Sequence, residues 1–251
     1  MGRAKDIIVK PISSKDGNRI IKALHYSGKV VQNSQIHLGV FLDGKCGGAL
    51  SFGPSMDKRK VSAIVAGTKW NEFLELNRMA LADWLPRNGE SRAIAVAMRI
   101  LKKNYPQLRW IISYSDGTQC GDGTIYRASG FILTGITKNS TIYEFPDGER
   151  VADIGIKTGY AWQKKRFGKT YLGEEAMRQA RKLGAKKIPG FQLRYIYFLD
   201  SNGRKNLTVK EIPFSEISRR GAGMYRGEKR VQSADSGTSG IQPGGDGANP
   251  I

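Results

Sequence analysis

One segment of the chain, residues 111–131, concentrates side chains that could take part in group transfer. It carries Asp116, Cys120 and Tyr126 around a turn rich in glycine. A carboxylate can accept a proton from an attacking amine, and a tyrosine can give a proton to a leaving group within hydrogen-bond reach. The thiol could act as a nucleophile, although nothing near it in the sequence is an obvious base. The residue types therefore indicate proton transfer during the making and breaking of a bond.

The elements that would position these side chains can be predicted from the pattern of apolar and turn residues. Residues 110–114 are predicted to form a strand, the glycines a turn, and the residues around Tyr126 a short helix that leads into a strand from Phe131. Residues 86–91 form a second turn before an apolar run that predicts a buried helix. The free N–H groups at the start of such a helix can bind an anionic donor. The residues predicted to bind the donor there are Arg87, Asn88 and Gly89.

The rest of the chain predicts one α/β domain over residues 1–217. A strand is expected within residues 7–12, then a helix starting near Ser13, and a hairpin around an Asp-Gly turn at 43–44. Further strands are expected at 73–81, 131–137, 141–145 and 194–200, and a helix at about 173–183. Helices alternate with strands that are partly linked by hairpins, which predicts a mixed sheet. Residues 218–251 are rich in Gly, Ser and Arg and are predicted to form a disordered tail.

The charge of the chain indicates a polyanionic partner. Among 251 residues there are 41 Lys and Arg against 22 Asp and Glu, so the formal net charge is +19. DNA or RNA is the first partner to consider, because binding phosphates with clustered cations releases counterions, and an anionic membrane surface is the second. Residues 157–194 alone hold eleven Lys or Arg and two Glu. The candidate DNA-binding residues in this segment are Lys164, Lys165, Arg166, Lys186 and Lys187, with a solvated charged face as the alternative.

The composition also excludes several classes of protein. Two cysteines and two histidines exclude a disulfide framework and a structural zinc site with four ligands. The N-terminus has no apolar signal-peptide region, and no run approaches the roughly 18 apolar residues of a membrane span. We therefore expect a protein of the cytoplasm with no membrane association.

Six short motifs follow one another in an order that gives a more specific indication. They are His-Tyr-Ser-Gly at 25–28, Leu-Asn-Arg at 76–78, Pro-Arg-Asn-Gly-Glu-Ser at 86–91, Ser-Tyr-Ser-Asp at 113–116, Gly-Thr-Ile-Tyr at 123–126 and Arg-Tyr-Ile-Tyr-Phe-Leu-Asp at 194–200. In this combination the chain resembles the Mom family of phage DNA-modification proteins over residues 7–210. The resemblance implies a GNAT-like fold, in which a mixed, mostly antiparallel central sheet is flanked by helices, here with a basic helical insertion at residues 157–194.

The resemblance also implies an activity and a partner. Proteins of the Mom family place a carbamoylmethyl group on the exocyclic N6 of adenine in phage DNA, which protects the DNA from host restriction enzymes. The implied substrate is double-stranded DNA in the cytoplasm of a bacterial host, and the oligomeric state is left open. An acyl-CoA-type donor such as acetyl-CoA is expected from the GNAT superfamily, where a tyrosine placed like Tyr126 protonates the departing sulfur.

The functional positions of the family fall on Tyr26, Arg78, Asp116 and Tyr126, with Ser91 and His25 as further candidates. Asp116 could be the general base or could cap a turn. Arg78 could polarise a carbonyl, hold an anionic donor or clamp a DNA phosphate. Tyr26 and His25 could stack on a flipped base or simply end a helix. These two side chains together with Asp116 and Tyr126 could also ligate iron.

Two alternatives to DNA modification remain open from the sequence. The chain could be a conventional GNAT N-acetyltransferase that acts on an amine or a protein, or a DNA-binding protein without catalysis. Residues 86–91 depart from the usual coenzyme A loop, since they contain one glycine and an acid, Glu90, which would repel phosphate. That departure argues against the conventional acetyltransferase.

Overall fold

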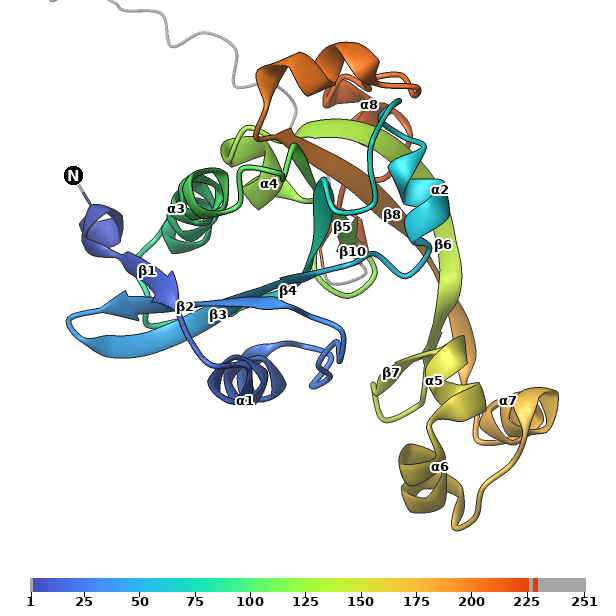
Figure 1. Ribbon diagram of the computed structural model, residues 1–251. Helices are drawn as coiled ribbons and strands as arrows, with labels where there is room; N and C mark the ends of the chain where they lie inside the picture. Colours follow the sequence, from blue (N-terminus) through green and yellow to red (C-terminus); the bar gives the residue numbers. More distant parts are fainter. Residues whose placement is uncertain (1, 226–227, 230–251) are drawn as a thin grey trace, which may run out of the picture.

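A computed structural model describes residues 2–225 and 228–229 of the chain (Figure 1). Its centre is an eight-stranded sheet in the order β1-β2-β3-β4-β5-β8-β6-β7, and β4 and β5 are the one parallel pair within this sheet. The strands are β1 Ile8–Pro11, β2 Ile36–Leu42, β3 Lys45–Gly53, β4 Phe73–Leu81, β5 Trp110–Asp116, β6 Ile132–Glu144, β7 Arg150–Ala152 and β8 Lys186–Phe198. The mixed, mostly antiparallel central sheet expected from the sequence is confirmed.

Helices cover both faces of the N-terminal half of this sheet (Figure 1). After the short 3-10 helix η1, Arg3–Asp6, helix α1 spans Ser14–Leu24 and packs Ile21 against β3 and β4. On the opposite face α3, Gly89–Asn104, buries Ile94 and Met98 in the largest hydrophobic cluster. Ser13 caps α1 by accepting a hydrogen bond from the Asp16 N–H at 3.0 Å, as the sequence predicts.

The hairpin between β2 and β3 confirms the predicted Asp-Gly turn. Asp43 and Gly44 both have left-handed backbone angles, with φ of 51° and 76°. This is the geometry of the tight turn that matches the twist of two antiparallel strands.

An interruption in the middle of the sheet separates its two halves. β4 and β5 pair only from Phe73–Trp110 to Glu75–Ile112 and then diverge. At the same place β4 has an extra residue relative to β3, because Phe52 lies opposite Leu76 and Ser51 lies opposite Arg78, which leaves Asn77 unopposed. Such a bulge bends a strand and changes which face its next side chains point to. Leu76 therefore joins the core under α3, whereas Arg78 points to the face covered by α1.

The C-terminal half extends into a small helical lobe at the far end of β6 and β8 (Figure 1). Its helices are α5 Asp153–Thr158, α6 Tyr160–Phe167 and α7 Gly173–Lys182, and they share a core with Phe145. The expected helical insertion is present, but it ends earlier than the basic segment. Lys186 and Lys187 begin β8, because they pair with Glu144 and Tyr143 of β6. β6 is also one long strand with an irregularity between Asn139 and Ile142, where two strands were predicted.

The remaining elements cover the sheet on the side of β5 and β8. Helix α2, Lys58–Ser62, packs Val61 against Trp110 and Ile196, and the 3-10 helix η2 spans Ser201–Asn206. Helix α8, Ser215–Arg219, is followed by the short strands β9 Met224–Tyr225 and β10 Glu228–Lys229. Within the described residues, no helix combines the length and apolar character needed to cross a membrane.

The packed part of the chain continues past residue 217, where the sequence predicts the domain to end. Ala222 and Met224 are buried, so the chain up to this point belongs to the folded unit. Residues 226–227 and 230–251 of the expected tail lie outside the described residues.

Candidate active site

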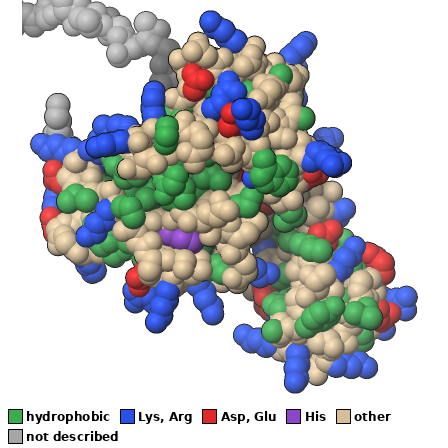
Figure 2. All heavy atoms as spheres, viewed as in Figure 1, with side chains coloured by type: hydrophobic (Ala, Val, Ile, Leu, Met, Phe, Trp, Pro, Cys, Tyr) green, Lys and Arg blue, Asp and Glu red, His purple; other side chains and the backbone are tan. Residues whose placement is uncertain are grey.

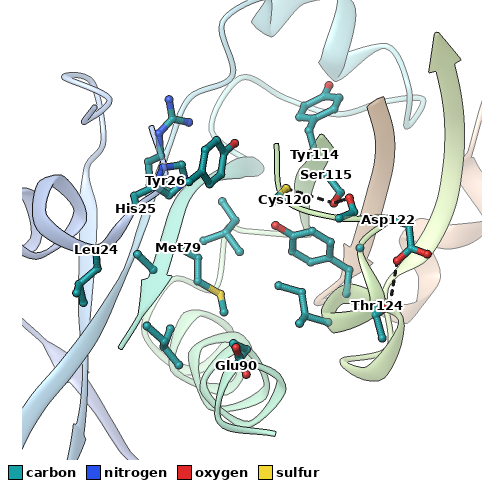
Figure 3. A pocket seen from close by; sticks show the side chains of 18 of the residues that line it. Leu24, His25, Tyr26, Met79, Glu90, Tyr114, Ser115, Cys120, Asp122 and Thr124 are labelled. Atoms are coloured by element: carbon teal, nitrogen blue, oxygen red, sulfur yellow. Dashed lines mark hydrogen bonds between the residues drawn. The ribbon is translucent and has the colours of Figure 1, made fainter. Parts of the chain in front are cut away.

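A cavity of about 440 Å³ lies where β4 and β5 diverge (Figure 3). Beyond Glu75 and Ile112 the two strands no longer pair with each other, so the side chains on their facing edges border an open space. The cavity is lined by the end of α1, by β4 and β5, and by the glycine-rich turn with α4, Thr124–Ala128. Four of the predicted site residues come together here: His25, Tyr26, Arg78 and Tyr126.

His25 and Tyr26 follow directly after α1, and their rings are in contact at an interplanar angle of 33°, with centroids 4.2 Å apart. The His25 Nδ1 accepts a hydrogen bond from the Ser27 backbone N–H at 3.2 Å and lies 2.8 Å from the Ser27 hydroxyl. Burial, and then the charge of Arg78, lower the pKa of His25 to about 4. The imidazole is therefore neutral near pH 7, and these contacts assign its proton to Nε2.

Arg78 is fixed by two backbone carbonyls. Its Nε donates to Lys29 O at 3.3 Å and its NH1 donates to Asn77 O at 2.7 Å. Because carbonyl oxygens carry no formal charge, the guanidinium keeps its full positive charge at the cavity wall. The bulge at Asn77 is what directs this side chain to the α1 side of the sheet.

Tyr126 is deeply placed on the predicted short helix. Its residue is only 8% exposed, and its ring packs 5.4 Å from Phe131 and 5.2 Å from Tyr195. Burial raises the pKa of Tyr126 to about 12. The phenol therefore stays protonated near neutral pH and can donate a hydrogen bond into the cavity that it lines.

Asp116 does not line the cavity. Its carboxylate accepts hydrogen bonds from the Thr118 N–H at 2.9 Å and from Asn139 Nδ2 at 3.2 Å. Its backbone carbonyl also receives the Cys120 N–H at 2.8 Å. In this structure Asp116 holds the glycine-rich turn in place. This is the second of the two roles considered from the sequence, general base or turn cap.

Cys120 does line the cavity, across from Tyr26 in Figure 3. Burial raises the pKa of the Cys120 thiol, and its Sγ lies 3.0 Å from Asp116 O. A protonated thiol is a poor nucleophile. The geometry therefore gives Cys120 the character of a packing residue.

A second cavity of about 400 Å³ adjoins the first at the start of α3. Arg87, Asn88 and Ser91 line it, and the Ser91 hydroxyl donates to Asn88 O at 3.1 Å. Gly89 lies beneath the surface, where an added Cβ would come within 3.3 Å of Ile7. Asp83 and Glu90 border both cavities, so the place where a coenzyme A pyrophosphate was expected carries two carboxylates.

The predicted iron ligands are not gathered around a common point. Asp116 is not among the residues that line the cavity with His25, Tyr26 and Tyr126, and its carboxylate accepts hydrogen bonds from Thr118 and Asn139. Among the described residues, no three His, Cys, Asp or Glu side chains come together as a metal-binding group. The iron prediction is therefore not supported.

The predicted DNA-binding residues lie on the lobe and differ in their surroundings. Lys164 and Lys165 are exposed on α6, and Lys186 and Lys187 are exposed at the start of β8. Arg166 instead forms ion pairs with Asp147 and Glu149 and stacks on Phe145 at 4.6 Å, so it holds the lobe together. Figure 2 shows Lys and Arg side chains around the edge of the lobe in the face it presents.

Two residues of the site were missed from the sequence. Tyr114 of β5 lines the cavity, and burial, followed by the charge of Glu75, raises its pKa to about 12. Glu75 of β4 lies near Tyr114 and Tyr126, since its charge contributes to the raised pKa of both, and burial raises its own pKa. Glu75 lies between the buried residues Leu74 and Leu76, and that pattern was the available signal for it. The divergence of β4 and β5, which opens the cavity to Tyr114, has no local signature.

One protein family matches most of this chain. The model of the Mom protein family matches residues 6–216. Methylcarbamoylase mom of Escherichia phage Mu is 37% identical over 210 residues, which are 82% of this chain and 81% of that protein.

Solved structures with weaker similarity include two acetyltransferases. The ribosomal-protein-S18-alanine N-acetyltransferase of Escherichia coli is 10% identical, with a TM-score of 0.40, and covers 77% of this chain and 94% of its own. A Bacillus subtilis acetyltransferase in complex with CoA is 9% identical, with a TM-score of 0.41, and covers 76% of this chain and 97% of its own.

Proposed function

The chain belongs to the Mom protein family, and from this we propose that it is a transferase that adds a carbamoylmethyl group to N6 of adenine in double-stranded DNA. The observation that carries the proposal is the cavity where β4 and β5 diverge. It gathers a neutral imidazole, a fixed cation and a buried phenol on a protein with a formal net charge of +19. The phage Mu relative is a methylcarbamoylase, which supports the same class of reaction.

The acceptor enters the cavity as an extruded base. N6 of adenine is paired inside the duplex, and enzymes that modify such an atom rotate the nucleotide out at a cost of a few kcal/mol. Tyr26 is 55% exposed and lines the same cavity as the buried Tyr126. An aromatic ring in this position can stack on the extruded purine, and the tilted His25 ring packs against Tyr26. His25 lines the same cavity, and its Nε2–H is available there as a hydrogen-bond donor.

Arg78 supplies the positive charge of the site. When N6 attacks, negative charge develops on the donor, and a fixed guanidinium stabilises that charge without having to reorganise. The two carbonyl contacts of Arg78 hold it in place for this purpose. If Arg78 served only to bind a DNA phosphate, its replacement would weaken DNA binding, whereas the proposed role predicts loss of reaction with DNA binding retained.

Tyr126 is the proposed proton donor. The group that departs from the donor takes up a proton, and a phenol that stays protonated until it is needed can provide it. The buried position of Tyr126 keeps its proton available near pH 7. The proton lost from N6 requires an acceptor, and Asp116 is the candidate base, although its carboxylate already accepts hydrogen bonds from Thr118 and Asn139.

Asp116→Asn distinguishes the two roles of Asp116. The amide oxygen of asparagine can still accept the Thr118 N–H and keep the turn, but an amide cannot take a proton from N6. Retention of activity in this variant would assign Asp116 to positioning of the turn. A loss of activity with an unchanged unfolding temperature would assign it to proton transfer.

The surroundings of the start of α3 differ from those expected for a coenzyme A pyrophosphate, although Arg87 lines the cavity there. The start of α3 offers backbone N–H groups, but Asp83 and Glu90 border the cavity beside them and repel a pyrophosphate. Acetyl transfer would also bond N6 to a carbonyl carbon, whereas the carbamoylmethyl product bonds N6 to a methylene carbon. The proposed reaction therefore needs a donor that presents this methylene carbon, or a second step.

Restriction of plasmid DNA tests the proposal. Plasmid from cells that express the protein should resist enzymes whose recognition sites contain adenine and should remain sensitive to enzymes whose sites lack it. Arg78→Ala and Tyr126→Phe should restore cleavage while the protein stays soluble. A conventional N-acetyltransferase would leave the plasmid sensitive and would release free thiol from acetyl-CoA in the presence of an amine.

A further inference from the structure

The loop between β3 and α2 presents an apolar side chain next to the cavity. Met56 in this loop is fully exposed, although its neighbour Ser55 is buried. Isolated apolar side chains do occur on protein surfaces, so exposure alone does not indicate a role. What distinguishes Met56 is that its neighbours Ser55 and Asp57 lie near residues of the site and that cations follow it in the chain.

Three observations place the ends of this loop near the cavity. Gly53 lies opposite Glu75, and a Cβ on Gly53 would lie 2.6 Å from the side-chain oxygen of Asn77, which lines the cavity. Ser55 lies at the carboxylate of Glu75. The charge of Asp57, after burial and Glu75, contributes to the raised pKa of Tyr114, another lining residue. Figure 3 shows Tyr114 beneath the pale cyan segment that carries α2.

The loop is also held firmly at its C-terminal end. Asp57 caps α2 by accepting the Lys60 N–H at 3.2 Å, and its carboxylate forms an ion pair with Lys60 Nζ at 3.1 Å. Lys58 lies over the ring of Trp70 at 4.3 Å, and Trp70 is itself 66% exposed. Met56 therefore projects from an anchored base, with Lys58, Arg59 and Lys60 in the next turn of chain.

We propose that Met56 is the wedge that enters the DNA duplex in place of the extruded adenine, while Lys58 and Arg59 bind the flanking phosphates. The inference rests on the proposed function, since it assumes that a base leaves the duplex for the cavity. Proteins that unstack DNA insert apolar side chains such as methionine between base pairs, and cations beside the wedge hold the backbone. An exposed apolar side chain in a loop near the cavity, followed by cations, meets both requirements.

Base extrusion can be measured without knowledge of the group donor. The full-length protein is mixed with duplexes in which 2-aminopurine replaces one adenine, in every combination of flanking bases, and fluorescence reports the base that leaves the stack. Wild-type protein should raise the fluorescence in at least one context. Met56→Ala should reduce this rise by roughly tenfold or more, because no apolar side chain then fills the gap that the extruded base leaves in the stack. Its affinity for the same duplex, from anisotropy of an end label, should change by less than about twofold, since the cations remain.

Two matched variants and one altered duplex complete the experiment. Met56→Leu keeps an apolar tip and should retain the signal, and Ile8→Ala removes another exposed apolar side chain, on β1, and should have no effect. A duplex with an abasic site opposite the 2-aminopurine should restore extrusion by Met56→Ala, because the base is already unpaired.

The outcomes separate this inference from the proposed function. If wild-type protein extrudes the base and Met56→Ala does so equally well, the wedge assignment is overturned and the proposed function stands. Loss of duplex binding by Met56→Ala would also overturn it, since a wedge acts after binding. If wild-type protein extrudes no base in any context and leaves DNA unmodified, the proposed function itself has failed.

Discussion

Replacement of Gly123 by alanine should disturb the helix that carries Tyr126. Gly123 precedes α4 with a left-handed φ of 79°, and an added Cβ would lie 2.7 Å from Cζ and 2.8 Å from Oη of Tyr195. Tyr195 is fully buried, and its hydroxyl donates to Asp122 O at 2.5 Å. The ring therefore cannot turn aside without losing that hydrogen bond, so the methyl group must displace either the ring or α4.

The expected loss of stability has two parts. A left-handed alanine costs about 1–2 kcal/mol, and the added methyl group in a packed core costs about 1–3 kcal/mol. Gly148→Ala is the matched control, because Gly148 has a φ of 81° and an added Cβ would meet no atom within 4 Å. The difference between the two variants should therefore be about 1–3 kcal/mol. In a domain of this size each kcal/mol shifts the melting temperature by about 2–4 °C.

Thermal and urea unfolding of both variants measure this difference. Gly123→Ala should also lose DNA modification at temperatures where it is still folded, because α4 positions Tyr126, while Gly148→Ala should keep it. Equal destabilisation of the two variants, to within about 0.5 kcal/mol, would show that the contact with Tyr195 does not constrain α4 and would refute this reasoning.

Three further predictions concern the site and the lobe. Tyr126→Phe removes one hydroxyl, so it should stay folded but lower the modified nucleoside, measured by mass spectrometry, by about 10²–10⁴-fold; unchanged modification would exclude Tyr126 as the proton donor. His25 has a pKa of about 4, below its ordinary value of 6.5, so the unfolded chain binds its proton more readily. The contribution of His25 to the free energy of unfolding should be complete above about pH 6.5 and should be lost as the pH falls towards about 4. His25→Gln should make the free energy of unfolding depend less on pH in this range. An equal dependence on pH in wild type and variant would contradict the assigned pKa. Replacing Lys164 and Lys165 by glutamine should reduce the slope of log affinity for DNA against log salt by about 2, and an unchanged slope would remove them from the DNA interface.

Features with a local cause could be predicted from the sequence. The Asp43–Gly44 hairpin follows from two residues that tolerate left-handed backbone angles, and the cap of α1 follows from Ser13. The short helix with Tyr126 was also predicted, because glycines delimit it on both sides. In each case the residues that determine the structure lie within a few positions of one another.

Features that depend on strand pairing could not be predicted in this way. The bulge at Asn77 exists only relative to β3, yet it decides which face Arg78 occupies. Lys186 and Lys187 looked like part of a helical basic segment, and their pairing with β6 makes them part of a strand. Asp116 was expected at the reaction centre, whereas its carboxylate binds Asn139 on β6, which β8 separates from β5 in the sheet. Each of these outcomes depends on residues distant in sequence.

The site as a whole was predicted through family resemblance more than through local pattern. His25, Arg78 and Tyr126 come from three separate segments, and no spacing rule brings them together. The divergence of β4 and β5 does so, since it opens one cavity to the end of α1, to β4 and to α4. That divergence is the physical basis of the proposed reaction.

Nucleoside mass spectrometry of DNA from expressing cells tests the central claim most directly. DNA from cells with the wild-type protein should contain a deoxyadenosine that is heavier by a carbamoylmethyl group, with fragmentation placing the added mass on the base at N6. Cells with soluble, folded Arg78→Ala protein should contain far less of it. Normal nucleosides alone, from cells with abundant folded wild-type protein, would contradict the assignment of this cavity to adenine modification.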